Sequence, residues 1–166
     1  MMKVGDNVVV RAASAQDWPA VLNVLQEARL DCFLSGLEQW QDFFCIEDQQ
    51  DSRVIGCFTF AQMGEVGILK NFAIISMGRK KGLGLIVANN AIPFIAQQKG
   101  ITKLYLHGNK RPPHYTSFYF WEKTCFHHIA VADIKDASYR DYLNDLIARC
   151  PPEILEKEAV FYLEIA

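Results

Sequence analysis

One segment decides how the rest of the chain is interpreted: Ile68-Leu69-Lys70-Asn71-Phe72-Ala73-Ile74-Ile75-Ser76-Met77-Gly78-Arg79-Lys80-Lys81-Gly82-Leu83-Gly84. An apolar run typical of a strand leads into a basic, glycine-containing loop, and a helical pattern opens at the last glycine. A helix N-terminus has unpaired backbone N–H groups and a partial positive charge, so it attracts phosphate. Gly82 and Gly84 let the backbone approach a ligand closely. The segment therefore predicts a bound phosphate or pyrophosphate, with added positive charge from three residues, Arg79, Lys80 and Lys81.

Two other phosphate-binding patterns are absent from this segment. No Gly-Lys-Ser/Thr follows the spacer that a Walker loop requires, and Val87 stands where the dinucleotide fingerprint has its third glycine. An ordinary strand–helix turn with solvated basic residues remains the alternative interpretation.

Size and composition favour one globular domain over residues 1–166. The chain is 51% hydrophobic and has a net charge of −2, so no nucleic-acid partner is expected. No apolar run approaches the roughly 20 residues of a membrane span, and the N-terminus does not resemble a signal peptide. Five scattered cysteines suit a reducing compartment. We therefore expect a cytoplasmic protein that does not bind membranes.

Hydrophobic periodicity and turn residues predict an α+β fold in which helices flank a mixed sheet. A capping box at Ser14–Asp17 precedes the first helix, Pro93 is expected to disturb the third helical segment, and residues 34–40 fit either a short helix or a loop. Because a helix connects strands 65–75 and 101–107, we expect these two to be parallel. The predicted strands cover residues 7–12, 41–47, 53–62, 65–75, 101–107, 126–132 and 159–165, and the helices 18–29, 81–98, 114–124 and 138–149.

The loop Arg79-Lys80-Lys81-Gly82-Leu83-Gly84, after the strand Asn71-Phe72-Ala73-Ile74, resembles the coenzyme A signature of the GNAT superfamily of N-acetyltransferases. A second stretch, Phe120-Trp121-Glu122-Lys123-Thr124-Cys125-Phe126, is similar to that family's Phe-Tyr-x-x-Leu-Gly-Phe. The resemblance implies a central, mostly antiparallel sheet with one splayed parallel pair. It also implies direct acetyl transfer from acetyl-CoA to an amine in a ternary complex.

The resemblance further implies where the coenzyme binds. The pantetheine arm would hydrogen-bond to the backbone of Phe72, Ala73 and Ile74, and the Ile74 N–H would stabilise the oxyanion. The pyrophosphate would rest on the amides of residues 79–84, which include Leu83. Trp121 falls on the tyrosine that usually protonates the leaving thiolate, and indole is not a usable acid, so that role does not transfer directly.

A narrower resemblance concerns the amine acceptor. Gly36-Leu37-Glu38, residues 68–74, the aromatic Trp121 and the C-terminal stretch are similar to acetyltransferases of arsenic-resistance operons and to amino-acid N-acetyltransferases. This implies a small, amino-acid-like acceptor whose carboxylate pairs with Lys70, while Glu38 belongs to the acceptor-side wall. A solvated strand end for Lys70 and a solvated helix position for Glu38 are the alternatives. Asn71 would face away from Lys70 unless a bulge intervenes.

Three further interpretations complete the sequence-based picture. Glu65 is a candidate general base, although a turn residue after Gly64 is the preferred interpretation. His127 and His128 point to opposite faces of a strand and no second ligand pair follows, so no metal is expected. The substitution of tryptophan for tyrosine keeps open a non-catalytic acyl-CoA-binding regulatory module. A different phosphate-ligand protein is a third alternative, and a homodimer is the oligomer we consider.

Overall fold

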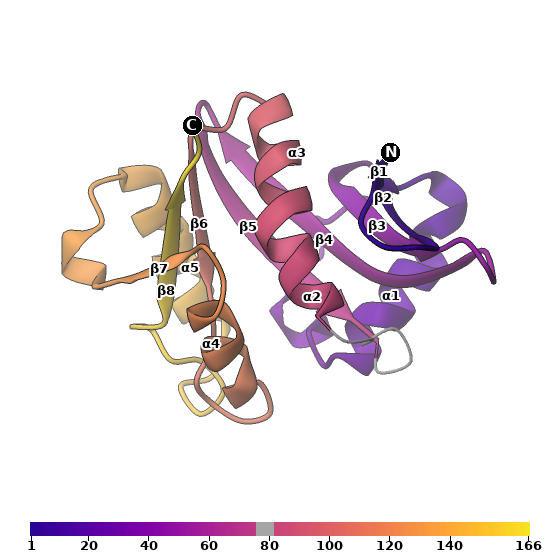
Figure 1. The fold of residues 1–166 in the computed structure, drawn as a ribbon. Coiled ribbons are helices and arrows are strands. Elements are labelled where there is room, and N and C mark those ends of the chain that lie inside the picture. Colours follow the sequence, from indigo (N-terminus) through magenta and orange to yellow (C-terminus); the bar gives the residue numbers. More distant parts are fainter. Residues whose placement is uncertain (76–81) are drawn as a thin grey trace. The chain divides into compact units, whose positions relative to one another are not determined.

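The computed structural model describes residues 1–75 and 82–166 (Figure 1). Within that part of the chain, eight strands form one sheet in the order β1-β2-β3-β4-β5-β6-β8-β7. The pairs β1–β2, β2–β3, β3–β4, β6–β8 and β7–β8 are antiparallel, whereas β5 and β6 pair in parallel from Val66↔Lys103 to Leu69↔Leu106. The predicted mixed sheet, with one parallel pair and flanking helices, is therefore confirmed.

The strands and helices follow the predicted order closely. The strands are β1 (Met2–Lys3), β2 (Val8–Ala12), β3 (Phe43–Asp48), β4 (Arg53–Met63), β5 (Val66–Ile74), β6 (Lys103–His107), β7 (His127–Ile129) and β8 (Val160–Glu164). The helices are α1 (Trp18–Glu27), α2 (Leu83–Ile86), α3 (Ile92–Gln98), α4 (Tyr115–Glu122) and α5 (Ala137–Arg149). A π-helical stretch, Val87–Ala91, joins α2 to α3, and single 3-10 turns occur at Ala15–Asp17, Asp31–Phe33, Trp40–Asp42 and Val131–Asp133.

Several boundaries differ from the predictions. The predicted strand 126–132 ends already at Ile129, because its ladder partner β8 begins at Val160, opposite that residue. The predicted strand 41–47 starts only at Phe43, since Trp40–Asp42 forms a 3-10 turn. The short strand β1 was not predicted. The ambiguous segment 34–40 is a loop between two 3-10 turns rather than a helix.

Two local predictions hold in detail. Asp17 accepts a hydrogen bond from the Ser14 backbone N–H at 2.7 Å, as the predicted capping box requires, and also from Arg11 Nη1 at 2.7 Å. The irregularity expected at Pro93 takes the form of the π-helical stretch that ends two residues before it. Proline has no N–H to donate to the preceding turn, which explains why the regular helix is interrupted there.

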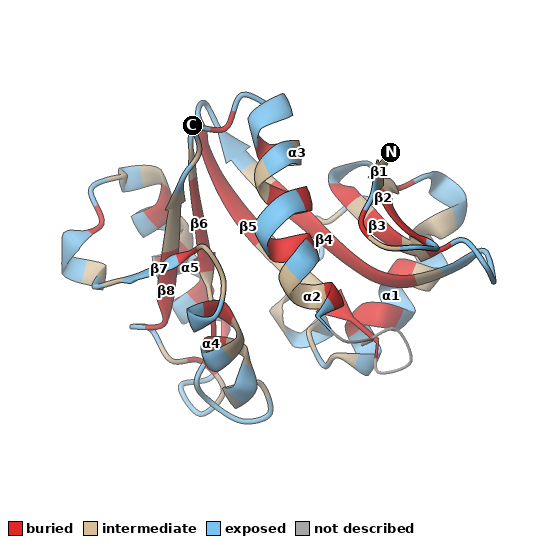
Figure 2. Ribbon diagram, in the orientation of Figure 1, coloured by how far each residue is buried: buried red, intermediate tan, exposed pale blue. Residues whose placement is uncertain are grey.

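The chain divides into two compact units, which are described separately. The first comprises Met1–Phe60 and Lys70–Ile92. Its core contains aromatic rings from β3 and β4: Phe44 and Phe58 stack at 5.3 Å, and Trp18 of α1 meets Phe43 edge-on at 5.4 Å. The fully buried side chains of this unit also come from α1 and from the π-helical stretch, and include Val21, Leu25, Val87 and Ala88 (Figure 2).

The second unit comprises Ala61–Leu69 and Pro93–Ala166. Tyr105 of β6 stacks on Tyr139 of α5 at 4.6 Å, so α5 covers the face of β6 and β8 that carries Tyr105 and Tyr162. Phe161 alternates to the other face, where Phe118 of α4 meets it at 5.1 Å. The alternating pattern of β8 is thus buried on both faces, by α5 on one and α4 on the other.

Candidate functional site

The strand β5 becomes irregular where the coenzyme segment begins, that is, at residues 71–74, of which 72–74 are predicted to bind the pantetheine arm. Its register with β6 ends at the pair Leu69↔Leu106, and two residues later Asn71 adopts a left-handed conformation with a φ of 56°. Lys70, Asn71 and Phe72 are all half-buried, whereas a regular strand would alternate between faces. Asparagine is one of the few residues that adopts this conformation readily. Lys70 and Asn71 would face opposite sides of a regular strand, and this irregularity removes that requirement.

Beyond Asn71 the strand is again extended and lies against β4. The N–H of Ile75 donates to the carbonyl of Ile55 in β4 at 2.8 Å. Main-chain donors of successive residues in an extended strand point to opposite edges. The N–H of Ile74 is accordingly directed away from β4, and that of Phe72 follows by the same alternation. Ala73 and Ile74 are themselves buried.

The helix that follows begins at a glycine that needs its conformational freedom. Gly82 precedes α2 with a φ of 74°, and its carbonyl accepts the Ile86 N–H at 3.0 Å. Leu83 is buried, and Gly84 is half-buried in the first turn. The predicted phosphate-binding residues Arg79, Lys80 and Lys81 lie outside the described residues.

Glu38, one of the two predicted acceptor-binding residues, is held by a turn in the first unit. The carboxylate of Glu38 accepts hydrogen bonds from Ser35 N and Ser35 Oγ, both at 2.8 Å, and from Gly36 N at 2.9 Å. Partial burial alone would raise the pKa of Glu38, but the hydrogen bonds from Ser35 and the positive charge of Lys70 outweigh it, and the pKa is lowered. Glu38 therefore stays ionised, and its charge acts on Lys70.

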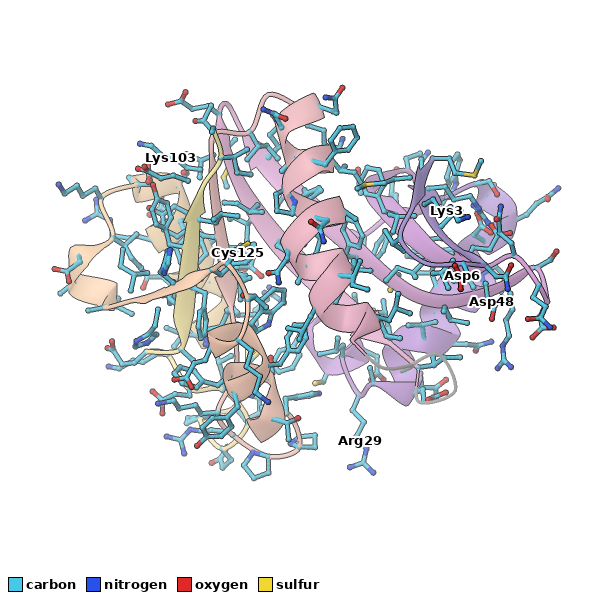
Figure 3. The ribbon with its side chains drawn as sticks, viewed as in Figure 1. Lys3, Asp6, Arg29, Asp48, Lys103 and Cys125 are labelled. Atoms are coloured by element: carbon cyan, nitrogen blue, oxygen red, sulfur yellow. The ribbon has the colours of Figure 1, made fainter. Side chains whose placement is uncertain are left out.

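Arg29 lies in the first unit, just after the end of α1. It follows α1 with a φ of 56°, and its side chain is exposed and extends outward from the end of that helix (Figure 3). It provides surface charge at this position and does not contribute to the Glu38 turn.

Glu65 occupies an exposed turn. It follows Gly64, whose φ is 62°, and its carbonyl accepts the Thr102 N–H at 2.8 Å. Glu65 precedes the first residue of β5, whereas Ile74 is the last, and a strand advances about 3.3 Å per residue. The structure therefore does not bring Glu65 and Ile74 to the same end of the strand, which favours the turn interpretation of Glu65.

Trp121 is packed inside the second unit. It is 4% exposed, and its ring meets Phe126 edge-on at 5.2 Å. A Cβ added to Gly108 would lie 2.8 Å from Trp121 Cδ1, so the indole fills the space above that glycine. Its neighbour Tyr119 on α4 is 57% exposed. This packing accounts for the large apolar ring without a catalytic role.

Sequence reasoning missed Asn109, which organises the loop between β6 and α4. The residue is buried; its Oδ1 accepts Glu156 N at 2.9 Å, and its Nδ2 donates to the carbonyl of Ile154. His107 contacts the carbonyl of Glu156, and burial lowers the pKa of that histidine. The only sequence signal for this role is an asparagine next to Gly108 in a predicted loop.

The histidine and cysteine candidates do not form a metal-binding cluster in the part of the chain that the structure describes. No cluster of three or more His, Cys, Asp or Glu side chains with metal-binding geometry occurs among residues 1–75 and 82–166. Cys125, at the position of the family glycine, is a half-buried free thiol whose pKa is raised by burial. Over the same described ranges, no helix combines the length and apolar character needed to cross a membrane.

Comparisons with known proteins agree with this geometry. The model of the acetyltransferase (GNAT) family matches residues 10–126, so the chain belongs to that family. A comparison with curated proteins found no match. The family and the fold inferred from the loop at residues 79–84 are thereby confirmed.

Solved structures share the fold at low sequence identity. N-acetylglutamate synthase from Neisseria gonorrhoeae, in complex with coenzyme A and N-acetyl-glutamate, is 16% identical with a TM-score of 0.67; the match covers 96% of this chain and 35% of that one. A GNAT acetyltransferase from Staphylococcus aureus Mu50 is 10% identical with a TM-score of 0.68, covering 96% and 99%. A GNAT acetyltransferase from Elizabethkingia anophelis with acetyl-CoA bound is 18% identical with a TM-score of 0.60, covering 96% and 99%. This chain thus spans about a third of the synthase.

Proposed function

We propose that this protein is an acetyl-CoA-dependent N-acetyltransferase that acts on a small amine by direct transfer in a ternary complex. The observation that carries the proposal is the course of β5 in a chain of the GNAT family. The strand's parallel register with β6 ends at Leu69, Asn71 is left-handed, and a left-handed Gly82 precedes the helix α2. Structural neighbours with the same fold carry coenzyme A or acetyl-CoA.

In this proposal, the coenzyme binds along residues 72–74 and at the start of α2. The direction of the Ile74 and Phe72 N–H groups, inferred from the Ile75–Ile55 hydrogen bond, supports their use by the pantetheine arm. The left-handed Gly82 and the amides of Leu83 and Gly84 would receive the pyrophosphate. Arg79, Lys80 and Lys81 would add positive charge.

The acceptor would be a small molecule with an amine and a carboxylate, such as an amino acid or an analogue. Lys70 and the ionised Glu38 place opposite charges near each other, which suits an acceptor that itself carries both charges. The ammonium of Lys70 would pair with the carboxylate. That one neighbour is in complex with N-acetyl-glutamate is compatible with this class of acceptor.

The reaction needs little beyond positioning. The neutral amine attacks the thioester carbonyl, the Ile74 N–H stabilises the oxyanion, the C–S bond breaks, and the thiolate leaves. Because Trp121 is no acid and is packed in the core, we propose that water supplies the proton to the thiolate. The extra proton of the attacking amine passes to solvent. Glu65 stays a predicted base that the geometry of β5 disfavours.

Thiol release from acetyl-CoA with a panel of amino acids and other small amines tests this proposal. We expect turnover with at least one acceptor that carries a carboxylate. In Lys70→Ala the KM for that acceptor should rise about tenfold or more, because a charge-assisted pair is lost, while the KM for acetyl-CoA stays within about twofold. Equal KM values for the acceptor in both proteins would contradict the assigned role of Lys70.

Trp121 gives one specific reason to keep a second candidate, a non-catalytic acyl-CoA-binding module. Tight coenzyme A binding without turnover on any amine would favour it. A single domain over residues 1–166, a cytoplasmic location and a homodimer stay predictions from the sequence.

A further inference from the structure

The neighbouring strand β4 contacts the coenzyme segment of β5 at its least regular residue. Cys57 is fully buried, and its thiol donates a hydrogen bond to the carbonyl of Asn71 at 3.6 Å. Asn71 is the left-handed residue at which β5 changes course. Cys45 lies directly opposite Cys57 on β3 and is equally buried, but β4 separates its strand from β5. The two thiols are thus matched in type and burial but differ in their contact with the segment.

The residue before Cys57 determines how closely the two strands approach. A Cβ added to Gly56 would lie 2.6 Å from the carbonyl oxygen of Ala73 and 3.1 Å from Ile74 Cγ1. The first distance is about 0.8 Å shorter than an ordinary contact of 3.4 Å, and its partner is backbone that cannot rotate away. Ile46 Cδ1, 2.9 Å from the same point, blocks the other direction. Any side chain at position 56 would therefore displace residues 73–74.

We propose that Gly56 and Cys57 are positioning residues that set the affinity for the coenzyme. Neither would touch the ligand; they fix the main chain of residues 71–74, whose donors would hold the pantetheine arm. The inference rests on the proposed function. A main-chain N–H cannot be reoriented by rotating a side chain, so its direction depends on the position of the backbone. A misplacement of about 1 Å at a reacting centre can cost about a hundredfold in rate. The closeness of β4 is accordingly a determinant of binding as well as of packing.

Isothermal titration with coenzyme A, together with urea denaturation, separates these roles. The test variants are Gly56→Ala and Cys57→Ala. The matched controls are Cys45→Ala, which leaves a similar cavity on the opposite strand, and Gly67→Ala. An added Cβ at Gly67 would meet Ile101 Cδ1 at 2.7 Å, so this control is also crowded but lies outside residues 71–75.

We expect Gly56→Ala to weaken coenzyme A binding about tenfold or more, and Cys57→Ala about threefold. Both controls should bind within about twofold of the wild type, although they also lose stability. Test and control variants are compared by their loss of coenzyme A affinity at an equal loss of unfolding free energy. If Gly56 and Cys57 had a purely structural role, this loss of affinity would be the same in test and control variants. If Gly56→Ala does not fold, Cys57→Ala against Cys45→Ala still decides the question.

Two outcomes would overturn the inference in distinguishable ways. If the wild type binds coenzyme A and the test variants follow their controls, Gly56 and Cys57 have no positioning role, while the proposed function stands. If the wild type binds no coenzyme A, the proposed function fails and the inference fails with it.

Discussion

From the left-handed conformation of Asn71 in β5 we predict how a substitution at this position changes the free energy of unfolding. The left-handed conformation costs a residue other than glycine roughly 1–2 kcal/mol, and it costs asparagine less than most residues. A β-branched residue is rarely found in this conformation. Asn71 is half-buried, so its replacement leaves little cavity. We expect Asn71→Val to lower the free energy of unfolding by about 1–2 kcal/mol, which corresponds to a melting temperature about 2–8 °C lower for a domain of this size. Asn71→Gly should be close to neutral.

Urea denaturation and thermal unfolding of both variants measure the difference directly. Glycine at the same position is the matched control, because it removes the same side chain but tolerates a positive φ. Coenzyme A affinity should fall in the valine variant and stay near the wild-type value in the glycine variant. A valine variant as stable as the glycine variant would refute the reasoning, since the strand would then have no need of the left-handed turn at residue 71.

Three further predictions concern other parts of the chain. The Arg11 guanidinium holds the pKa of Asp17 well below its usual range, so Asp17 stabilises the fold above the unfolded pKa of about 3.9, and this stabilisation is lost as the pH falls. Asp17→Asn should therefore lower the free energy of unfolding, measured by urea denaturation, by about 1–3 kcal/mol at pH 7 and by less at pH 3. Gly84→Asp should abolish measurable coenzyme A binding in calorimetry without unfolding the protein, because an acid in the first helical turn suits the dipole but repels pyrophosphate. Glu65→Gln should keep kcat within about twofold in the thiol-release assay, and a loss above about tenfold would restore it as a general base.

The main elements were predictable because their signals are local. Glycine and basic residues after an apolar strand indicate the start of a helix, and the segment between Ser14 and Asp17 caps a helix through bonds within four residues. The parallel pairing of β5 with β6 follows from the helix that connects them. These features depend on neighbours in the sequence, so they can be inferred without knowing the fold.

The site was only partly predictable. The sequence suggested residues 72–84 for the coenzyme and Lys70 and Glu38 for the acceptor, and the positive charge of Lys70 is one of the causes that lower the pKa of Glu38. It could not show that Glu38 is held by the turn that begins at Ser35. Nor could it show that the Glu65 carbonyl accepts the Thr102 N–H, because that hydrogen bond joins two segments far apart in the sequence.

By itself, the sequence determined the class of fold, the order of its helices and of its strands apart from β1, and the loop that marks the GNAT family. The tertiary structure alone decided that Asn71 is left-handed, that Cys57 of β4 contacts it, that Gly56 lies against Ala73 and Ile74, and that Asn109 joins its loop to residues 154–156. The physical reason is that these contacts pair groups that lie 14 to 47 residues apart. Their geometry depends on how closely two backbones approach, which no local pattern of residues encodes.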